Sequence, residues 1–155
     1  MKVRITPMKP EHLDEVLAIE AVSFPLPWNR QTFLFEIILN ELADYIVALT
    51  NRRVIGYGGM WLVMDEAHLT NIAVHPDFRG RGVGRQLLRE LIRRAAAQGL
   101  KKMTLEVRPS NLTARRIYAE FGFEEKGVRK RYYRDNNEDA IIMWLEDLQQ
   151  GFSSP

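Results

Sequence analysis

The chain has 155 residues and no cysteine. This absence excludes disulfides, thiolate metal sites and cysteine nucleophiles, and it fits the reducing cytoplasm. No apolar run approaches the ~20 residues that a membrane-spanning helix needs. The first residues, MKVRITP, are charged and short of apolar side chains, so they do not resemble a signal peptide. We expect a cytoplasmic protein that does not associate with membranes.

Histidine is nearly as scarce, because only His12, His68 and His75 occur. They lie far apart in the sequence and no acidic cluster flanks them, so we expect no metal site. His75 could act as a base. Its place before Pro76, at the end of an apolar run, favours a turn residue instead.

Positive charge is in small excess, with a formal net charge of +2 at pH 7. This excess is too mild to indicate nucleic acid as a partner, and we expect no direct nucleic-acid binding. The basic residues gather in residues 79–94 and 126–134, where one cluster would face the phosphates of a ligand. A solvated helix face or hairpin is the alternative for both.

The overall composition is 46% hydrophobic and 27% charged, as in soluble globular proteins. The length suffices for one domain with a sizeable core. We expect a single domain over residues 1–147 and a flexible C-terminal tail over residues 148–155.

Glycine is concentrated in the segment 77–85, where Gly80, Gly82 and Gly84 stand at alternate positions. An apolar β-type run precedes them and a strongly amphipathic helix pattern follows. Glycine permits sharp turns and a close approach to a ligand, and a helix N-terminus favours a phosphate. The segment therefore predicts a pyrophosphate-binding loop, with an ordinary glycine-rich turn as the alternative.

Two familiar nucleotide loops do not fit this segment. A P-loop ends in Gly-Lys-Ser or Gly-Lys-Thr, whereas Gly84 is followed by Arg85. A dinucleotide fingerprint has the pattern G-x-G-x-x-G, but its last glycine would fall on Arg85 or Leu87. The pattern that remains is Arg79-x-x-Gly82-x-Gly84.

The remaining sequence alternates between helix and strand patterns. We expect helices over residues 10–22, from an N-cap at Asn29, from Val83 to a C-cap at Gly99, and over 111–121. Phe33, Ile37 and Ile38 would form the apolar face of the second helix. The expected strands cover residues 3–5, 45–49, 54–63, 68–74, 103–107, 123–133 and 140–145.

A strand, a helix and a strand around the glycine segment imply a parallel crossover, whereas the other strands form hairpins. The sum is an α+β fold with a mixed, largely antiparallel sheet flanked by helices.

The Arg79-x-x-Gly82-x-Gly84 pattern resembles the pyrophosphate loop of the GNAT superfamily, the acetyl-CoA-dependent N-acetyltransferases. Within it, the chain resembles the RimI-like ribosomal-protein-alanine N-acetyltransferases over residues 3–146. The segments that carry this likeness are 71–76, 105–111, 117–123, 131–133 and 138–143. The resemblance implies the GNAT fold, acetyl-CoA as co-substrate, and transfer to the N-terminal α-amine of a protein, a ribosomal protein with N-terminal alanine.

The resemblance also implies a set of residues that bind acetyl-CoA. The backbone of Ile72, Ala73 and Val74 would pair with the pantetheine arm like an added strand. Asn111 would cap the following helix, bond to the same arm, or do both. The pyrophosphate would lie on the loop residues Arg79, Gly80, Arg81, Gly82, Val83, Gly84 and Arg85.

Two residues are candidates for the proton transfers. Glu106 stands in an apolar strand, on the face opposite Leu105 and Val107, and partial burial would raise its pKa toward neutrality, where a base works best. The alternative is a solvent-facing glutamate on an edge strand. Tyr118 could protonate the leaving thiolate or be an aromatic core residue. The resemblance assigns the base to Glu106 and the acid to Tyr118.

Aromatic residues on two loops are candidates for the acceptor site, with Phe24 and Trp28 on one loop and Tyr132 on the last hairpin. The alternative is that Phe24 and Trp28 fill the core beneath the first two helices, and that the neighbouring Tyr133 serves packing.

Two other functions stay open at this point. A small-molecule amine acetyltransferase would share the fold, but a small polycation would need more acidic residues around the site. A non-catalytic acyl-CoA sensor would not need both Glu106 and Tyr118. These features favour an enzyme that acts on a protein N-terminus.

Overall fold

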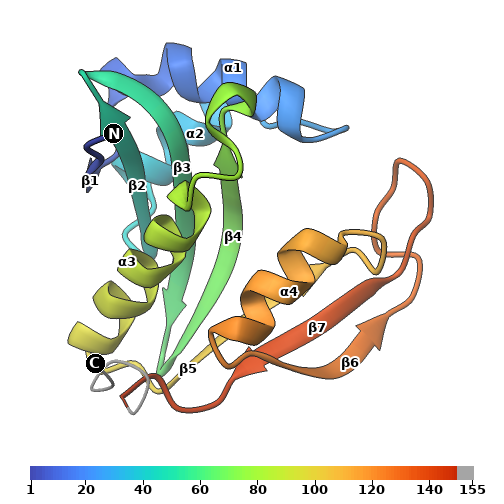
Figure 1. Ribbon diagram of the computed structural model, residues 1–155. Coiled ribbons are helices and arrows are strands. Elements are labelled where there is room, and N and C mark those ends of the chain that lie inside the picture. Colours follow the sequence, from blue (N-terminus) through green and yellow to red (C-terminus); the bar gives the residue numbers. More distant parts are fainter. Residues whose placement is uncertain (150–155) are drawn as a thin grey trace. The chain divides into compact units, whose positions relative to one another are not determined.

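Seven strands pair in the order β1-β2-β3-β4-β5-β7-β6 (Figure 1). The computed structural model describes residues 1–149. Strand β4 pairs with β5 in parallel, while β1 with β2, β2 with β3, β5 with β7 and β6 with β7 pair antiparallel. The expected α+β fold with a mixed, largely antiparallel sheet is therefore confirmed.

The elements follow the expected order along the chain. The strands are β1 (Arg4–Pro7), β2 (Ala43–Thr50), β3 (Arg53–Val63), β4 (Glu66–Val74), β5 (Lys102–Val107), β6 (Glu124–Arg129) and β7 (Ala140–Leu145). The α-helices are α1 (Leu13–Ser23), α2 (Arg30–Leu34), α3 (Val83–Ala97) and α4 (Leu112–Glu120). Short 3-10 turns η1 (Pro10–His12) and η3 (Pro76–Phe78) and a π-helical turn η2 (Phe35–Leu39) complete them. Along the described residues, no helix is both long and apolar enough to cross a membrane.

The residues gather into two compact units. Among the described residues, the first consists of Met1–Trp61 with Thr70–Leu91, and the second of Leu62–Leu69 with residues 92–149.

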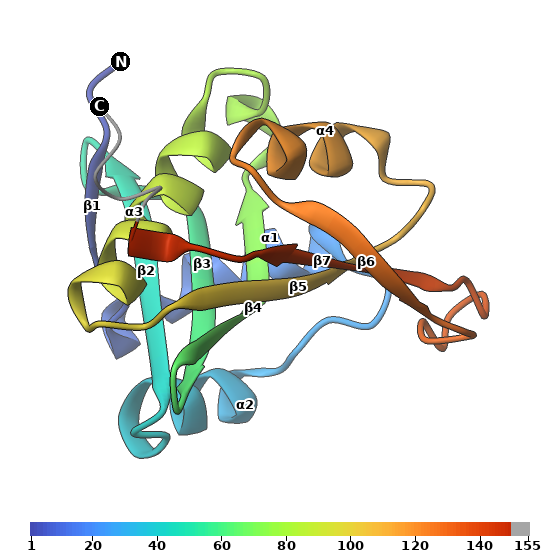
Figure 2. The same cartoon turned by 90° about the horizontal axis from the view of Figure 1, so that it is seen from below.

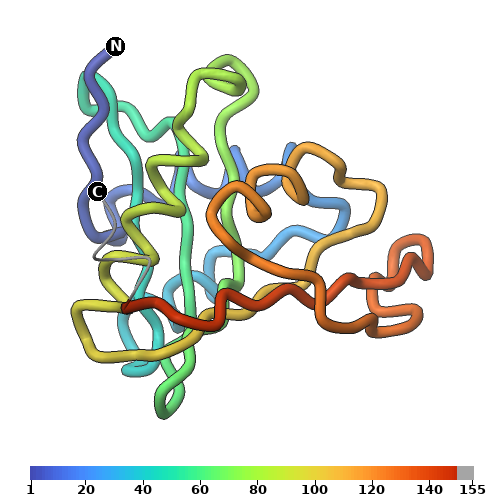
Figure 3. The backbone as a smooth tube through the Cα atoms, turned by 60° about the horizontal axis from the view of Figure 1, so that its bottom comes forward, coloured from blue at the N-terminus to red at the C-terminus, as the bar shows by residue number. Residues whose placement is uncertain are grey.

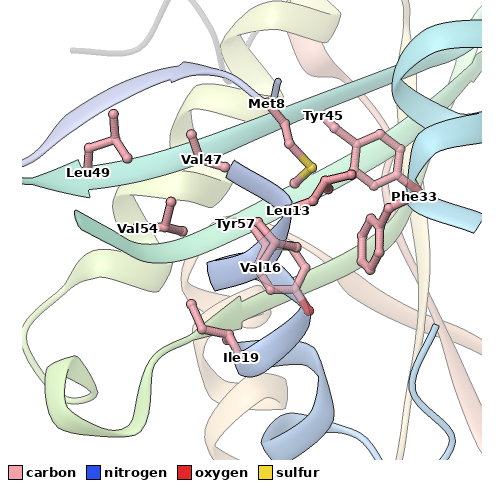
Figure 4. Close-up of a cluster of buried hydrophobic side chains, with 10 residues drawn as sticks. All are labelled: Met8, Leu13, Val16, Ile19, Phe33, Tyr45, Val47, Leu49, Val54 and Tyr57. Atoms are coloured by element: carbon pink, nitrogen blue, oxygen red, sulfur yellow. The ribbon is translucent and has the colours of Figure 1, made fainter. Parts of the chain in front are cut away.

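The first unit has an aromatic core (Figure 4). Phe33 is fully buried, and its ring meets those of Tyr45 and Tyr57 nearly edge-on, with centroids 6.4 and 5.9 Å apart. Helix α1 contributes Leu13, Val16 and Ile19, which share one face because they recur every three residues. The cluster consists of Met8, Leu13, Val16, Ile19, Phe33, Tyr45, Val47, Leu49, Val54 and Tyr57.

A buried carboxylate fixes the loop after α1. Glu20 is 2% exposed, accepts a hydrogen bond from the backbone N–H of Trp28 at 2.9 Å, and accepts another from the Tyr57 hydroxyl. A charge removed from water needs such partners. Burial, reinforced by the Glu20 charge, raises the pKa of Tyr57, so its hydroxyl stays protonated and remains a donor.

The second helix differs in part from the expectation. Asn29 caps it as expected, with its side chain accepting from the Thr32 N–H at 2.9 Å. The following turn is π-helical, closed by the bond from the Asn40 N–H to the Phe35 carbonyl at 2.9 Å. Because this wider turn changes the angular spacing of side chains, Ile38 is 61% exposed and not part of the apolar face.

In the second unit, β5 alternates between buried and partly exposed residues as expected, with Met103, Leu105 and Val107 buried. Figures 1 and 2 show α4 running along the strands of this unit. Gly99, with φ +82°, ends α3, and the Leu100 N–H donates to the Ala95 carbonyl at 3.1 Å, which confirms the C-cap.

The strand expected over residues 123–133 is shorter than expected, because β6 ends at Arg129. Arg131 has φ +52°, a left-handed conformation that a strand cannot contain. Figure 3 shows the chain between β6 and β7 as a folded loop.

The expected start of the flexible tail, at residue 148, is too early in the chain. Leu148 is fully buried and its N–H donates to the Lys101 carbonyl at 2.8 Å. The Gln149 side chain donates to the carbonyls of Ala96 and Leu100 at 2.9 and 3.1 Å. These two residues therefore belong to the packed part of the second unit. The rest of the expected tail, residues 150–155, lies outside the described residues, and the single domain stays a prediction.

The core assignment predicts unequal effects of two truncations on one helical segment. Phe33→Ala should lower the free energy of unfolding by about 3–5 kcal/mol, because it empties the centre of the aromatic core. Ile38→Ala should change it by no more than about 0.5 kcal/mol, because that side chain is exposed. Urea unfolding measures both. A large loss in Ile38→Ala would contradict the π-helical turn.

Candidate active-site residues

The glycine loop between η3 and α3 depends on two left-handed residues. Gly80 and Gly82 have φ +76° and +85°, and a Cβ added at either would meet nothing within 4 Å. The backbone is therefore open to a ligand on the side where other residues would carry a side chain. Gly84 differs, because its added Cβ would lie 3.8 Å from Val74 Cγ2.

Helix α3 begins directly at this loop. The Gln86 N–H donates to the Gly82 carbonyl at 3.1 Å and closes the first turn. The N–H groups before it are the ones that a helix leaves without helical partners, and they lie at the positive end of the helix dipole. The loop thus offers backbone donors suited to an anion.

Arg79 ties the loop to its own unit. Its Nε donates to the Val74 carbonyl at 2.9 Å, and its Nη2 donates to the Ser23 hydroxyl at 3.2 Å. The guanidinium group has five N–H donors, so this anchoring leaves others for a phosphate. The Val74 carbonyl accordingly already accepts one hydrogen bond.

A basic hollow of about 440 Å³ adjoins the loop in the first unit, lined by Met1, Lys2, Thr50, Asn51, Arg53, Phe78 and Arg81. The guanidinium groups of Arg53 and Arg81 lie 5.2 and 5.4 Å from the centre of the Phe78 ring. Such cation–π contacts hold both arginines near the loop. His75 is a turn residue, as expected, because its Nδ1 accepts from the Asp77 N–H at 3.0 Å.

In the second unit, Glu106 is held by two side-chain donors. His68 Nε2 lies 3.0 Å from Oε1 and 3.1 Å from Oε2, and the Tyr132 hydroxyl donates to Oε1 at 3.1 Å. The Glu106 side chain is 9% exposed and that of His68 is 34% exposed. Strand β5 lies between β4 and β7 in the sheet, and its pairing with β4 ends at Thr104, two residues before Glu106.

The expected direction of the pKa shift of Glu106 is wrong, because this pKa is lowered and not raised. Burial does raise this pKa, but the hydrogen bond and charge of His68, the hydrogen bond from Tyr132 and the charge of Arg129 outweigh it, and the pKa is lowered. The carboxylate is therefore ionised at neutral pH and ready to accept a proton. It is a weaker base than the sequence suggested.

Tyr118 lies buried on α4, with its ring centroid 5.7 Å from that of Phe123. Burial, with a smaller effect of Tyr133, raises its pKa, so the hydroxyl stays protonated at neutral pH. Over residues 1–149 every fully buried side-chain nitrogen or oxygen has a hydrogen-bond partner. The Tyr118 hydroxyl makes no hydrogen bond to another of these residues, and the residue is 7% exposed.

The loop that carries Tyr132 is clamped by Arg108, which sequence reasoning missed. Its guanidinium group bonds to Asp135 at 2.7 Å and Glu138 at 3.3 Å, and lies 3.9 Å from the centre of the Tyr133 ring. The contact of Arg108 with the Tyr133 ring favours the packing alternative for Tyr133. An arginine just after β5 and acidic residues before β7 were the signal available in the sequence.

The other residues expected to bind the acceptor substrate differ in how deeply they are buried. Trp28 is partly buried, with its ring 5.3 Å from Phe33 and 6.4 Å from Tyr45, which favours the core alternative. Phe24 is also partly buried, whereas Tyr132 is 44% exposed. Asn111 caps α4 by accepting from the Ala114 N–H at 3.1 Å.

The glycine loop and the mixed sheet agree with the comparisons to known proteins. The sequence pattern of the acetyltransferase (GNAT) family matches residues 13–123, and the chain belongs to this family. Members of the family use acetyl-CoA, so this chain is an acetyl-CoA-dependent acyltransferase.

Among its relatives, a Bacillus subtilis protein with a proposed [ribosomal protein bS18]-alanine N-acetyltransferase activity is 41% identical over 93% of this chain and 95% of its own length. The [ribosomal protein bS18]-alanine N-acetyltransferase of Salmonella typhimurium is 40% identical over 82% and 86%. The crystal structure of the ribosomal-protein-S18-alanine N-acetyltransferase from Escherichia coli has a TM-score of 0.86, 34% identity and 94% coverage of both chains.

The loop assignment predicts a difference between Gly82 and Gly99, two left-handed glycines that flank α3. Gly82→Ala and Gly99→Ala should each cost about 1–2 kcal/mol of stability, because both residues are left-handed. Only Gly82→Ala should also raise the KM for acetyl-CoA, by about tenfold, equivalent to ~1.4 kcal/mol of binding. Steady-state kinetics and thermal unfolding check this. Equal KM values in both variants would contradict the loop assignment.

Proposed function

We propose that this protein transfers the acetyl group of acetyl-CoA to the N-terminal α-amine of a protein, a ribosomal protein with N-terminal alanine. The observation that carries the proposal is the near full-length match, in both directions, to relatives named for that reaction. The same relatives favour this function over acetylation of a small-molecule amine.

The chemistry of the acceptor supports an α-amine. The amine must be neutral to attack a thioester. An α-amino group has a pKa near 8, so about a tenth is neutral at pH 7, whereas less than about a thousandth of lysine side chains is. A base whose pKa is lowered, as that of Glu106 is, suits the acceptor that is easier to deprotonate.

The proposal assigns the pyrophosphate of acetyl-CoA to the glycine loop. The open approach to Gly80 and Gly82 and the donors at the start of α3 support this role. It assigns pantetheine to the backbone of residues 72–74 and to Asn111, and assigns the acceptor peptide to Phe24, Trp28 and Tyr132.

In the proposed reaction, Glu106 accepts the proton that the amine loses as its nitrogen attacks the acetyl carbonyl carbon. The carbon–sulfur bond then breaks, and Tyr118 gives its phenolic proton to the leaving sulfur. Solvent returns a proton to Tyr118 and removes one from Glu106. Two features support these roles: Glu106 is ionised and Tyr118 is protonated at neutral pH.

A peptide series tests the acceptor. Turnover on a peptide with a free N-terminal alanine should exceed turnover on the same sequence, N-terminally blocked and carrying an internal lysine, by about a hundredfold, the difference in neutral amine. Mass spectrometry of the products locates the acetyl group. Equal or preferred lysine acetylation would rule out the N-terminal assignment while leaving family membership intact.

Two variants test the proton transfers. Glu106→Gln keeps the shape but removes the base, and should lower kcat by ~10²–10⁴-fold with the KM for acetyl-CoA nearly unchanged. Raising the pH should recover part of this loss, because more of the amine is then neutral. Tyr118→Phe should also lower kcat, but higher pH should not restore it, because solvent at high pH supplies no proton.

The pH–rate profiles of both variants against wild type provide the measurement. Full activity in Tyr118→Phe would make Tyr118 a packing residue. Wild-type turnover in Glu106→Gln across neutral pH would assign the base to another group.

A further inference from the structure

The contacts of Glu106 are unequal in kind. His68 Nε2 lies almost equally far from the two carboxylate oxygens, at 3.0 and 3.1 Å, whereas Tyr132 contacts Oε1 alone at 3.1 Å. A donor shared by both oxygens restrains the rotation of the carboxylate about its terminal bond. A donor to one oxygen restrains it less.

The two donors also come from different kinds of segment, one from a strand and one from a loop. His68 stands on β4, where it pairs in register with Thr104 of β5. Since side chains two residues apart on a strand share a face, this register places His68 beside Glu106. Tyr132 instead lies on the loop between β6 and β7 and is 44% exposed.

We propose that His68 is a positioning residue for Glu106. It holds the carboxylate in one orientation through the shared Nε2–H, and its charge sets how readily Glu106 takes a proton. This inference rests on the proposed role of Glu106 as the base.

The first part follows from the geometry of proton transfer. A general base acts only when an oxygen lies within hydrogen-bond reach of the proton it removes. A glutamate side chain has three rotatable bonds, and restraining them before the substrate arrives removes an entropic cost from the reaction. His68 contacts both oxygens and Tyr132 contacts Oε1 alone, so Oε2 carries fewer of these contacts and is the oxygen that we assign to the substrate proton.

The second part follows from the charges that face Glu106. These are His68 from β4, Arg129 from β6, and the hydroxyls of Tyr132 and Tyr133 from the following loop. Arginine is always charged and the pKa values of both tyrosines are raised, so these three do not change charge near neutral pH. Histidine is the side chain that ordinarily changes charge between about pH 5 and 8.

The sign of the effect is fixed. A protonated His68 stabilises the ionised form of Glu106 and makes it a poorer proton acceptor. A neutral imidazole stabilises a neighbouring carboxylate less, and the carboxylate then takes a proton more readily. The amine titrates as well, but its titration is the same for wild type and variants, so a ratio of rates removes it.

The test compares His68→Gln with His68→Leu. The glutamine amide N–H can take the place of Nε2–H but does not titrate, whereas leucine provides neither the donor nor the charge. His68→Leu should lower kcat on the order of tenfold to a hundredfold through misplacement of the base. The KM for acetyl-CoA should stay unchanged. His68→Gln should restore most of kcat above pH 8.

The pH dependence gives an independent readout. The ratio of wild-type kcat to that of His68→Gln should rise as the pH increases from 5 to 8, the range in which histidine titrates. His12→Gln is the matched control, because His12 only accepts from the Lys9 N–H at the start of α1, and should keep the wild-type profile. Circular dichroism verifies that each variant folds.

Several outcomes would overturn the inference. Wild-type kcat in His68→Leu would show that Tyr132 alone suffices. If His68→Gln were as slow as His68→Leu, an N–H donor shared by both oxygens would not explain the role of His68. If the ratio of wild-type kcat to that of His68→Gln did not change with pH, the charge of His68 would have no part in it. If Glu106→Gln kept wild-type turnover, Glu106 would not be the base, whatever the His68 variants show. This variant therefore tests the proposed base separately from the role of His68. If His68→Leu did not fold, His68→Gln and its pH profile would still decide.

Discussion

The parallel pairing of Glu66–His68 with Lys102–Thr104 is the constraint on which the chemistry of the second unit depends. It fixes the register between β4 and β5, and the two-residue period of the strands then places His68 and Glu106 on one face. A slip of one residue would turn one of them to the opposite face. The antiparallel pairing of Glu106 with Ile142 of β7 fixes the strand from its other side.

A second constraint acts on the chain that follows. Arg108, two residues after Glu106, pairs with two carboxylates of the loop between β6 and β7 and lies over the ring of Tyr133. The Ser110 N–H adds a bond to Glu138 at 2.9 Å. These contacts hold the loop on which Tyr132 reaches Glu106, so one short segment of sequence supplies both the carboxylate and the arginine that orders its second donor.

The elements with strong local patterns could be predicted from the sequence. The alternation in β5, the glycine that ends α3 and the caps at Asn29 and Asn111 are set by neighbours within a few residues. The errors arose where unusual local backbone geometry or a residue distant in the sequence decides. The exposure of Ile38 depends on a π-helical turn, the end of β6 on a left-handed Arg131, and the pKa of Glu106 on a histidine 38 residues away in the sequence. His68 offered no signal alone, because its role requires the register.

The clamp around Arg108 has a consequence for proton linkage. Glu138, one of its carboxylates, accepts hydrogen bonds from Ser110 and Arg108. These bonds lower the pKa of Glu138 to about 2, below that of an unfolded glutamate. A depressed folded-state pKa adds stability that is complete above the unfolded value and is lost only as the pH falls through the folded one. The Glu138 carboxylate of the clamp therefore stays ionised from pH 8 down to pH 5. Its contribution to stability is kept over that range and is lost only in strong acid.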